Sequence, residues 1–130
     1  MTDPIADILI RIKNGYQAQK EIVEIPYSRL KQAIGEILAK EGFLASCQVK
    51  TLKNRFKVLS LGLKYDKKTP ALTNVKRISK PGLRVYAPAN KIPPVKYGFG
   101  ITIVSTPKGL MTGSEAKKKH LGGEIIGQIW

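Results

Sequence analysis

Apolar residues near the start of the chain follow the spacing of two amphipathic helices. They recur every three or four positions across residues 5–12, and Thr2 or Asp3 can cap the helix that this spacing predicts. The same spacing recurs across residues 30–38, where Ser28 is a suitable N-cap. The glycines that suit the ends of these two helices are Gly15 and Gly42.

Strand patterns lie on either side of the second predicted helix. Residues 22–25 form a short apolar run that a proline closes. Residues 43–52 and 56–65 flank a short polar turn, and the second of these stretches alternates apolar and polar positions, as a half-buried strand does. We therefore predict a helix-strand-helix-strand-strand domain over residues 1–65.

The hydrophobic runs of the second half are shorter and are interrupted by glycine and proline. Residues 66–70 are four polar residues followed by proline, so we predict a linker there. The predicted strands that follow are residues 75–78, 83–87, 101–106 and 124–130. Ser114 can cap a short helix that ends at Lys119. The fold class is therefore α+β with two small domains, the second of them β-rich and spanning residues 71–130.

Charge changes this picture by pointing to a partner. The chain has 130 residues, and 23 Lys and Arg against 9 Asp and Glu give it a formal net charge of +14. Residues 66–130 contain 12 basic and only 3 acidic residues, so the second domain carries most of the excess. Such a charge is compatible with nucleic acid, an anionic membrane surface or an acidic protein.

A membrane surface and, among the nucleic acids, DNA lack a mechanism in the sequence. No apolar run is longer than three residues, and neither predicted helix combines a basic face with Trp or Phe, so we expect no membrane partner. A DNA-compacting protein would bring a basic helix or a wedge residue on a β-arm, and neither early helix is strongly basic. RNA is therefore the favoured partner.

Residue counts also argue against an enzyme, a metal site and a cofactor. A single cysteine, Cys47, excludes an internal disulfide, and with one histidine it cannot build a Cys/His zinc cluster. His120 follows three lysines and is typical of a surface imidazole. The acidic start, with Asp3 and Asp7, is unlike a secretory signal, so we expect a cytoplasmic protein. An RNA-processing enzyme acting through Glu124 and His120 is the alternative of a different class.

The main candidate site lies at the end of a β-branched run. Ser105, Thr106, Pro107, Lys108 and Gly109 would form a tight turn that presents two hydroxyls and backbone N–H groups. Such groups suit the 2′-hydroxyls and phosphates of the shallow minor groove of double-helical RNA. An ordinary turn whose hydroxyls bond their own backbone remains the alternative.

Further candidate contacts come from alternation and charge. Arg84 and Tyr86 lie two positions apart on a predicted strand and share a face, which suits a phosphate contact beside a stacking ring. Val85 would then point inward, whereas a core position for Tyr86 is the alternative. The weaker candidates are basic residues of a type common on protein surfaces, namely Arg11, Lys13, Lys53, Arg55, Lys117 and Lys118.

Longer stretches of the sequence carry a resemblance to a known family. Residues 100–117 are GITIVSTPKGLMTGSEAK, and GGEII follows at residues 122–126. Earlier stretches match in the same order, at residues 2–7, 11–15, 41–43 and 77–86. Together they resemble the bacterial small-subunit ribosomal protein eight family over nearly the whole chain.

The resemblance implies a structural constituent of the small ribosomal subunit. It implies primary binding to the central domain of the small-subunit rRNA in platform assembly, neighbouring ribosomal proteins as partners, and in many members repression of a ribosomal-protein messenger. It assigns the RNA loop to residues 105–109, the groove-facing aromatic to Tyr86 and a loop-buttressing carboxylate to Glu124. Two departures stand out: Pro107 replaces the usual Ser, and Gly113-Ser114 replace the usual Asp-Arg.

Overall fold

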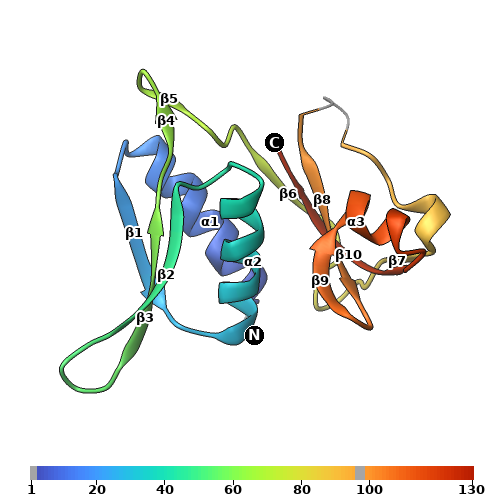
Figure 1. Ribbon diagram of the computed structural model, residues 1–130, viewed down its shortest axis with the longest axis horizontal. Helices are drawn as coiled ribbons and strands as arrows, with labels where there is room; N and C mark the ends of the chain where they lie inside the picture. Colours follow the sequence, from blue (N-terminus) through green and yellow to red (C-terminus); the bar gives the residue numbers. More distant parts are fainter. Residues whose placement is uncertain (1–2, 96–98) are drawn as a thin grey trace. The chain divides into compact units, whose positions relative to one another are not determined.

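The computed structural model describes residues 3–95 and 99–130 and confirms the α+β class. The chain divides into two compact units, unit 1 spanning Met1–Thr73 and unit 2 spanning Asn74–Trp130 (Figure 1). This division lies after the residues 66–70 that the sequence suggested as a linker. In the described part of the chain, no helix is both long and apolar enough to cross a membrane.

Unit 1 contains the two predicted helices, α1 (Pro4–Gln17) and α2 (Arg29–Lys40). The Asp3 carboxylate accepts hydrogen bonds from the first backbone N–H groups of α1, and the Ser28 hydroxyl accepts one from the Lys31 N–H of α2, so both predicted caps are confirmed. The prediction that Gly15 ends the first helix is wrong. A Cβ at Gly15 would lie 2.5 Å from Val23 Cγ2, so this glycine allows close packing against β1 (Ile22–Pro26).

A three-stranded antiparallel sheet packs with these helices. Its order is β1-β3-β2, with β2 at Ser46–Thr51 and β3 at Lys57–Gly62. The predicted linker instead forms a hairpin of β4 (Tyr65–Asp66) and β5 (Thr69–Pro70). The fully buried side chains of unit 1 come from both helices and from the strands and include Ile8, Leu9, Ile12, Ile25, Ile34, Leu38, Leu59 and Leu61.

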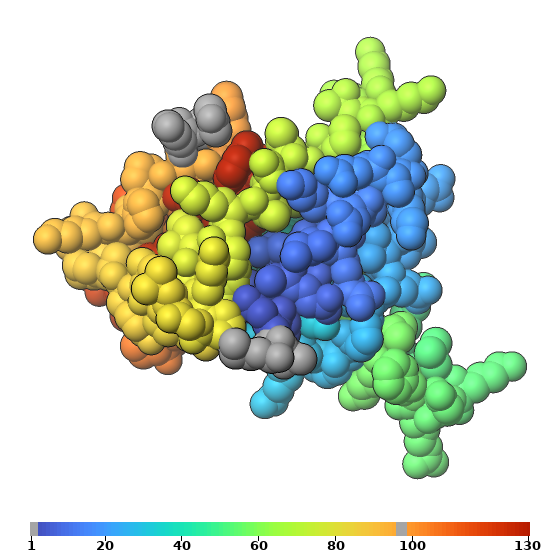
Figure 2. Space-filling view, turned by 180° about the vertical axis from the view of Figure 1, so that it is seen from behind, coloured from blue at the N-terminus to red at the C-terminus, as the bar shows by residue number. Residues whose placement is uncertain are grey.

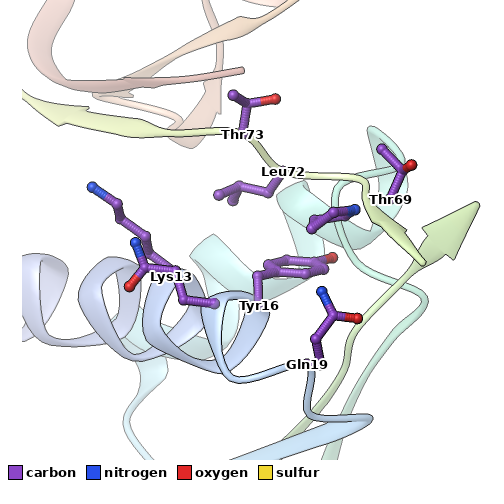
Figure 3. Close-up of a pocket in the computed structure, with 8 residues that line it drawn as sticks. Lys13, Tyr16, Gln19, Thr69, Leu72 and Thr73 are labelled. Atoms are coloured by element: carbon purple, nitrogen blue, oxygen red, sulfur yellow. The ribbon is translucent and has the colours of Figure 1, made fainter.

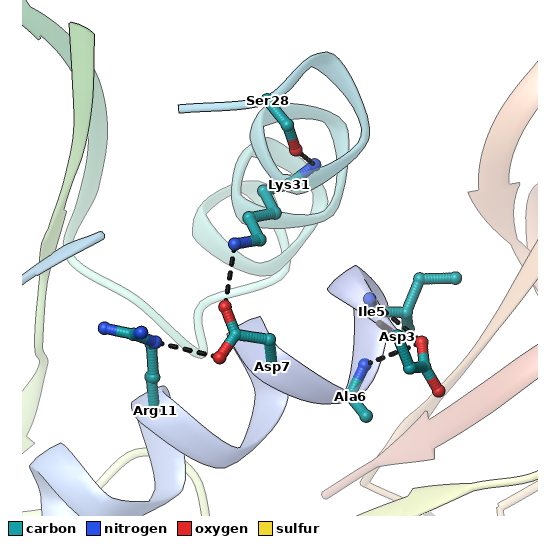
Figure 4. A network of polar contacts seen from close by, with 7 residues as sticks. All are labelled: Asp3, Ile5, Ala6, Asp7, Arg11, Ser28 and Lys31. Carbon is teal, nitrogen blue, oxygen red and sulfur yellow. Dashed lines mark hydrogen bonds and ion pairs between the residues drawn. The ribbon is translucent and has the colours of Figure 1, made fainter. Parts of the chain in front are cut away.

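One carboxylate joins the two helices of unit 1. Asp7 accepts hydrogen bonds from Lys31 Nζ at 2.7 Å and from Arg11 Nε at 2.9 Å (Figure 4). Lys31 first and Arg11 second hold the pKa of Asp7 below its ordinary value of 3.8. The charged form of Asp7 therefore contributes to the stability of unit 1.

Acid should weaken the packing of α1 against α2 through this carboxylate. Since the pKa of Asp7 is lower in the folded chain, its contribution is complete above the unfolded value near 3.8 and is lost as the pH falls through the folded value. The Asp7 side chain is 38% exposed, so we expect a loss of only about 0.5–1 kcal/mol. Urea unfolding of the parent and Asp7→Asn at pH 2.5 and pH 6 measures this loss, and Glu36→Gln is the control for an exposed helix carboxylate. The expectation would be contradicted if the difference in free energy of unfolding between the parent and Asp7→Asn were as large at pH 2.5 as at pH 6.

Unit 2 is a five-stranded antiparallel sheet with one short α-helix. The strand order is β6-β10-β8-β9, and β7 also pairs with β10. Its elements are β6 (Val75–Arg77), β7 (Tyr86–Ala87), the 3₁₀ helix η1 (Ala89–Lys91), β8 (Ile101–Thr106), β9 (Gly109–Thr112), α3 (Gly113–Lys118) and β10 (Gly123–Ile129).

Two details of unit 2 correct the sequence prediction. The sequence did not predict β9. The helix α3 is capped by the Thr112 hydroxyl, which accepts a hydrogen bond from Glu115 N–H, and not by Ser114.

The core beneath the sheet joins strand residues to α3 and to the residue after η1, and its buried members are Ile92, Val104, Met111, Ala116 and Ile125. A register shift between Ile125 and Gly127 leaves Ile126 as a bulge in β10.

Candidate nucleic-acid interface

Three predicted site residues are aligned across the sheet of unit 2. Glu124 on β10 lies opposite Tyr86 on β7 and opposite Ser105 on β8. Side chains at directly opposed positions share a face of a sheet. The next pair, Ile125 opposite Val104, belongs to the core, so the row of Tyr86, Glu124 and Ser105 faces away from that core. We call these three residues the cross-strand row.

Tyr86 is accessible to a partner. Its side chain is 69% exposed, whereas Val85 is partly buried against the unit 2 core. The prediction that Val85 points inward and Tyr86 outward is confirmed, and the core alternative for Tyr86 is wrong. An exposed tyrosine ring on an ordered strand is suited to stacking on a base or packing in a groove.

Glu124 connects the cross-strand row to the segment before β7. Its carboxylate accepts hydrogen bonds from the Ser79 hydroxyl and from Arg84 NH1, the latter at 3.0 Å. Ser79 is fully buried and its hydroxyl also accepts from Val85 N–H. These partners are not the groups of the 105–109 loop that the resemblance implied. Glu124 instead orients the exposed guanidinium of Arg84 beside Tyr86.

Sequence reasoning missed Ser79, although it lies within a stretch that carried the family resemblance. Its hydroxyl is the buried end of a network that joins Ser79, Glu124 and Arg84. Ser79 and Arg84 both lie 40 or more residues before Glu124 in the sequence. A single serine after an apolar residue gives no signal of such a role. The signal that could have led to Ser79 is Glu124, an acid in a basic domain. A half-buried carboxylate requires hydrogen-bond donors, and Ser79 is one of them.

The loop after β8 is a tight turn between Thr106 and Gly109, which pair across β8 and β9. Pro107 and Lys108 form its exposed tip, while Thr106 is 8% exposed. The Thr106 hydroxyl donates to Gly109 O at 2.8 Å and accepts from Lys108 N at 3.1 Å. Thr106 therefore holds the shape of the turn from within, which is the ordinary-turn alternative for this one hydroxyl.

The turn also depends on its proline and glycine. Proline fixes φ near −65°, which suits the first corner of a turn. Gly109 has φ +109°, a conformation that L side chains rarely adopt. The tip that results exposes Lys108, while Ser105 on the cross-strand row is half-buried.

Two consecutive glycines bring the start of β10 close to its neighbours. A Cβ at Gly123 would overlap the carbonyl oxygen of Ser105, and one at Gly122 would lie 2.6 Å from the carbonyl oxygen of Ala87. Both neighbours are backbone atoms, so no side chain fits at either position. This close approach sets the distances among the three strands that carry Tyr86, Glu124 and Ser105.

Unit 2 thus presents Tyr86, Glu124 and Ser105 on the face of its sheet that points away from the core, with Arg84 paired to Glu124. Residues 3–130 match the family described as ribosomal protein S8. The chain belongs to that family. It is 48% identical over 130 residues to the small ribosomal subunit protein uS8 of Mycoplasmopsis synoviae strain 53, covering 100% of this chain and 98% of that protein. It is 47% identical over 131 residues to the uS8 proteins of Streptococcus pyogenes serotype M5 strain Manfredo and serotype M1, with the same coverage.

Membership in the S8 family confirms the resemblance found in the sequence. It identifies a structural protein of the ribosome and not an enzyme. The histidine considered for the enzyme alternative, His120, is exposed just after α3. Burial raises the pKa of the Cys47 thiol to about 11, so this thiol is a weak nucleophile.

One of the two departures from the usual family pattern has a packing explanation. A Cβ at Gly113 would lie 3.0 Å from Ile92 Cγ2 and 3.4 Å from Thr102 Cβ. Glycine therefore fits the close approach of α3 to the residue after η1. Pro107 suits the first corner of the turn, but nothing in the structure explains why it replaces the usual serine.

The weaker candidate contacts of this S8-family protein are spread over several elements. Arg11 forms an ion pair with Asp7, and its side chain is 47% exposed. Lys13 lines a cavity of about 400 Å³ in unit 1 together with Tyr16, Gln19, Thr69, Leu72 and Thr73 (Figure 3). Lys117 and Lys118 are exposed in the last turn of α3. Lys53 and Arg55 lie at the exposed turn between β2 and β3.

Proposed function

We propose that this protein is a constituent of the small ribosomal subunit in the cytoplasm and binds the central domain of the small-subunit rRNA in platform assembly. The contact surface is the cross-strand row together with Arg84 and the 105–109 turn. Neighbouring small-subunit ribosomal proteins are its other partners. The observation that carries the proposal is the alignment of Tyr86, Glu124 and Ser105 on the face of the sheet that points away from the core.

The chemistry of this surface supports RNA in preference to other polyanions. Residues 74–130 contain ten Lys or Arg and two acids, which favours a phosphate backbone. Ser105 offers a short hydroxyl and Tyr86 an exposed ring, and both can reach a shallow minor groove that displays 2′-hydroxyls. Lys108 at the exposed turn and Arg84, which is paired with Glu124, add positive charges that can contact phosphates.

Titration of single variants at several salt concentrations tests the proposal. With a transcript of the rRNA central domain, Lys108→Ala should weaken binding and reduce the magnitude of the salt slope by about 0.7–0.9, the release of one counterion. Ser105→Ala removes a hydrogen bond but no charge, so it should cost about 1 kcal/mol and leave the slope unchanged. Lys119→Ala, a change on the exposed α3 terminus, is the charge control.

A DNA version of the same sequence provides the comparison for the 2′-hydroxyl contacts. It should bind more weakly than the RNA at equal salt. Equal affinity for RNA and DNA, with Ser105→Ala binding like the parent, would mean that the 105–109 turn makes no specific contact and that the proposed site is wrong.

The same surface would serve translational repression, if a ribosomal-protein messenger presents the shape of the rRNA site. Two results together would support this second role. Such a messenger should displace the rRNA transcript from the parent chain. Ser105→Ala and Lys108→Ala should each weaken the messenger complex and the rRNA complex by the same factor.

A further inference from the structure

The turn between β2 and β3 in unit 1 has features that the proposed function leaves unused. Residues 52–57, which we call the hairpin tip, are all exposed. Figure 2 shows this part of the chain, in green, standing clear of the blue portion of unit 1 with its side chains extended outward. The hairpin tip therefore has no packing role that would account for its composition.

The hairpin tip is nevertheless ordered by hydrogen bonds. Leu52 N–H donates to Phe56 O at 2.8 Å, and Arg55 N–H donates to Leu52 O at 2.9 Å. The Asn54 side chain accepts from Phe56 N–H at 3.1 Å, an Asx turn that fixes the approach to β3. The backbone of the hairpin tip therefore loses less conformational freedom when a partner binds.

Arg55 occupies a backbone position that favours glycine or asparagine. Its φ is +63°, in the left-handed region where a Cβ is unfavourable. Such a residue in a tight hairpin turn weakens the turn relative to glycine. Strain of this kind points to a use for the side chain, which here is a guanidinium.

The side chains of the hairpin tip combine charge with an exposed ring. No acidic residue occurs between Glu41 and Asp66, whereas Lys50, Lys53, Arg55 and Lys57 cluster at the turn. Among the described residues, no carboxylate pairs with Lys53 or Arg55, while Lys57 lies 5.5 Å above the Tyr27 ring. Phe56 is 52% exposed and Leu52 is 45% exposed.

Unpaired cations close in sequence to an exposed phenylalanine fit an unpaired nucleotide. Lys53 and Arg55 would contact phosphates, and the Phe56 ring would stack on the base, since every base has a π-face. An acidic protein surface would answer the charge but would leave the ring and Leu52 without a matching partner. The combination therefore favours single-stranded RNA over an acidic protein.

A second hairpin of unit 1 supplies the comparison that isolates the ring. Lys67 and Lys68 form the turn between β4 and β5, with φ values of +51° and +76°. Both lysines are exposed, and the turn has no aromatic residue. Like the hairpin tip it presents exposed basic side chains on residues of positive φ, but Asp66 lowers its net charge and its turn presents no exposed ring.

We propose that the hairpin tip is a second RNA contact, in which Phe56 stacks on an unpaired base while Lys53 and Arg55 bind the flanking phosphates. This inference rests on the proposed function, because it takes the same rRNA as the partner. It adds an element of unit 1 and a single-stranded target to the groove contact of unit 2.

Fluorescence of a Phe56→Trp variant tests the stacking directly. The parent has one tryptophan, Trp130, so the added signal comes from the hairpin tip. A twelve-nucleotide oligouridylate at low salt should quench the added emission, because a stacked base quenches tryptophan. Polyglutamate of equal charge should leave it unchanged. Quenching by polyglutamate and not by oligouridylate would overturn the proposal in favour of an acidic protein.

Binding to the rRNA central-domain transcript tests the contribution of each side chain in the full chain. Phe56→Leu should weaken binding about tenfold with an unchanged salt slope, because a ring is lost and no charge changes. Arg55→Gly should weaken binding and lower the slope magnitude by about 0.7–0.9, yet raise the thermal midpoint followed by circular dichroism, since glycine relieves the positive φ.

The matched control is Lys67→Asn combined with Lys68→Gly, which removes two charges from the other strained hairpin. It should affect binding of the rRNA central-domain transcript less than Phe56→Leu does. If the control equals or exceeds Phe56→Leu, or if Phe56→Leu binds like the parent, the hairpin tip is not an RNA contact.

The two proposals fail separately. Loss of affinity in Lys108→Ala and Ser105→Ala with none in the hairpin-tip variants overturns the hairpin contact and leaves the unit 2 site in place. The reverse pattern supports the hairpin tip and overturns the unit 2 site. No loss in either set overturns both.

Discussion

Replacing Gly123 by alanine is expected to destabilise unit 2 severely, because β10 has no room for a side chain at that position. The new Cβ would overlap the Ser105 carbonyl oxygen and lie 2.9 Å from its carbonyl carbon and 3.2 Å from Thr106 Cα. These are backbone atoms of β8, so relief requires the two paired strands to separate. We expect a loss of about 3 kcal/mol or more in the free energy of unfolding.

The single tryptophan, Trp130, lies in unit 2, so its fluorescence can follow this unfolding in denaturant. The same variant should bind the rRNA central-domain transcript far more weakly, because the shift displaces Ser105 and the 105–109 turn. Binding should fail even under conditions in which a folded fraction remains.

Two other glycines of unit 2 separate the possible causes of that loss. Gly82 has no neighbouring atom within 4 Å and no positive φ, so Gly82→Ala should change stability by less than about 1 kcal/mol. Gly109 also has open space but a φ of +109°, so Gly109→Ala should cost about 1–2 kcal/mol through strain alone. A Gly123→Ala variant as stable as Gly82→Ala would show that β8 and β10 are not held this closely in solution.

Local patterns predicted the elements whose stability comes from nearby residues. The helical spacing and the caps at Asp3 and Ser28 led to α1 and α2, because a helix is defined by contacts three and four residues apart. Alternation placed Tyr86 outside and Val85 inside, because successive side chains of a strand point to opposite faces. The S8-family resemblance then supplied the class of function, which no local pattern could reach.

Features that follow no repeating local pattern could not be predicted. Gly15 appeared to end a helix, but it meets Val23 on a neighbouring strand. The short β4 and β5 strands looked like a linker because their residues are polar and their hairpin has no hydrophobic alternation. The positive φ of Arg55 also escaped prediction, since the sequence gives no reason to expect arginine at a position that favours glycine.

The candidate site was predicted in its residues more fully than in their roles. Tyr86, Glu124 and Ser105 share a face, but the register that aligns them exists only in the folded sheet. Thr106 turned out to bond its own turn, and Glu124 turned out to bond Ser79 and Arg84. Whether a side chain contacts a ligand or only positions a residue that contacts it depends on hydrogen-bond partners, and these lie far apart in the sequence.

Replacing Glu124 by leucine should destabilise unit 2 by about 1–3 kcal/mol. The Ser79 hydroxyl is fully buried and donates to the Glu124 carboxylate, so the variant leaves a buried donor without its acceptor. Glu124→Gln keeps an oxygen acceptor and should lose less than about 1 kcal/mol, because Arg84 is 48% exposed and its ion pair is weak. Combining Ser79→Ala with Glu124→Leu should recover part of the loss, as expected for groups in one network.

RNA affinity in the same variants distinguishes a positioning role for Glu124 from simple electrostatics. Removing an acid from a basic surface should strengthen RNA binding if only net charge matters. If Glu124 orients Arg84 toward a phosphate, Glu124→Gln should instead weaken RNA binding several-fold. Arg84→Ala should weaken binding of the parent chain by the same factor. It should have a smaller effect when it is introduced into the Glu124→Gln chain. Titration of the four proteins against the rRNA central-domain transcript completes this cycle. Tighter binding by Glu124→Gln would contradict the positioning role, because the carboxylate would then act on the RNA only by repulsion.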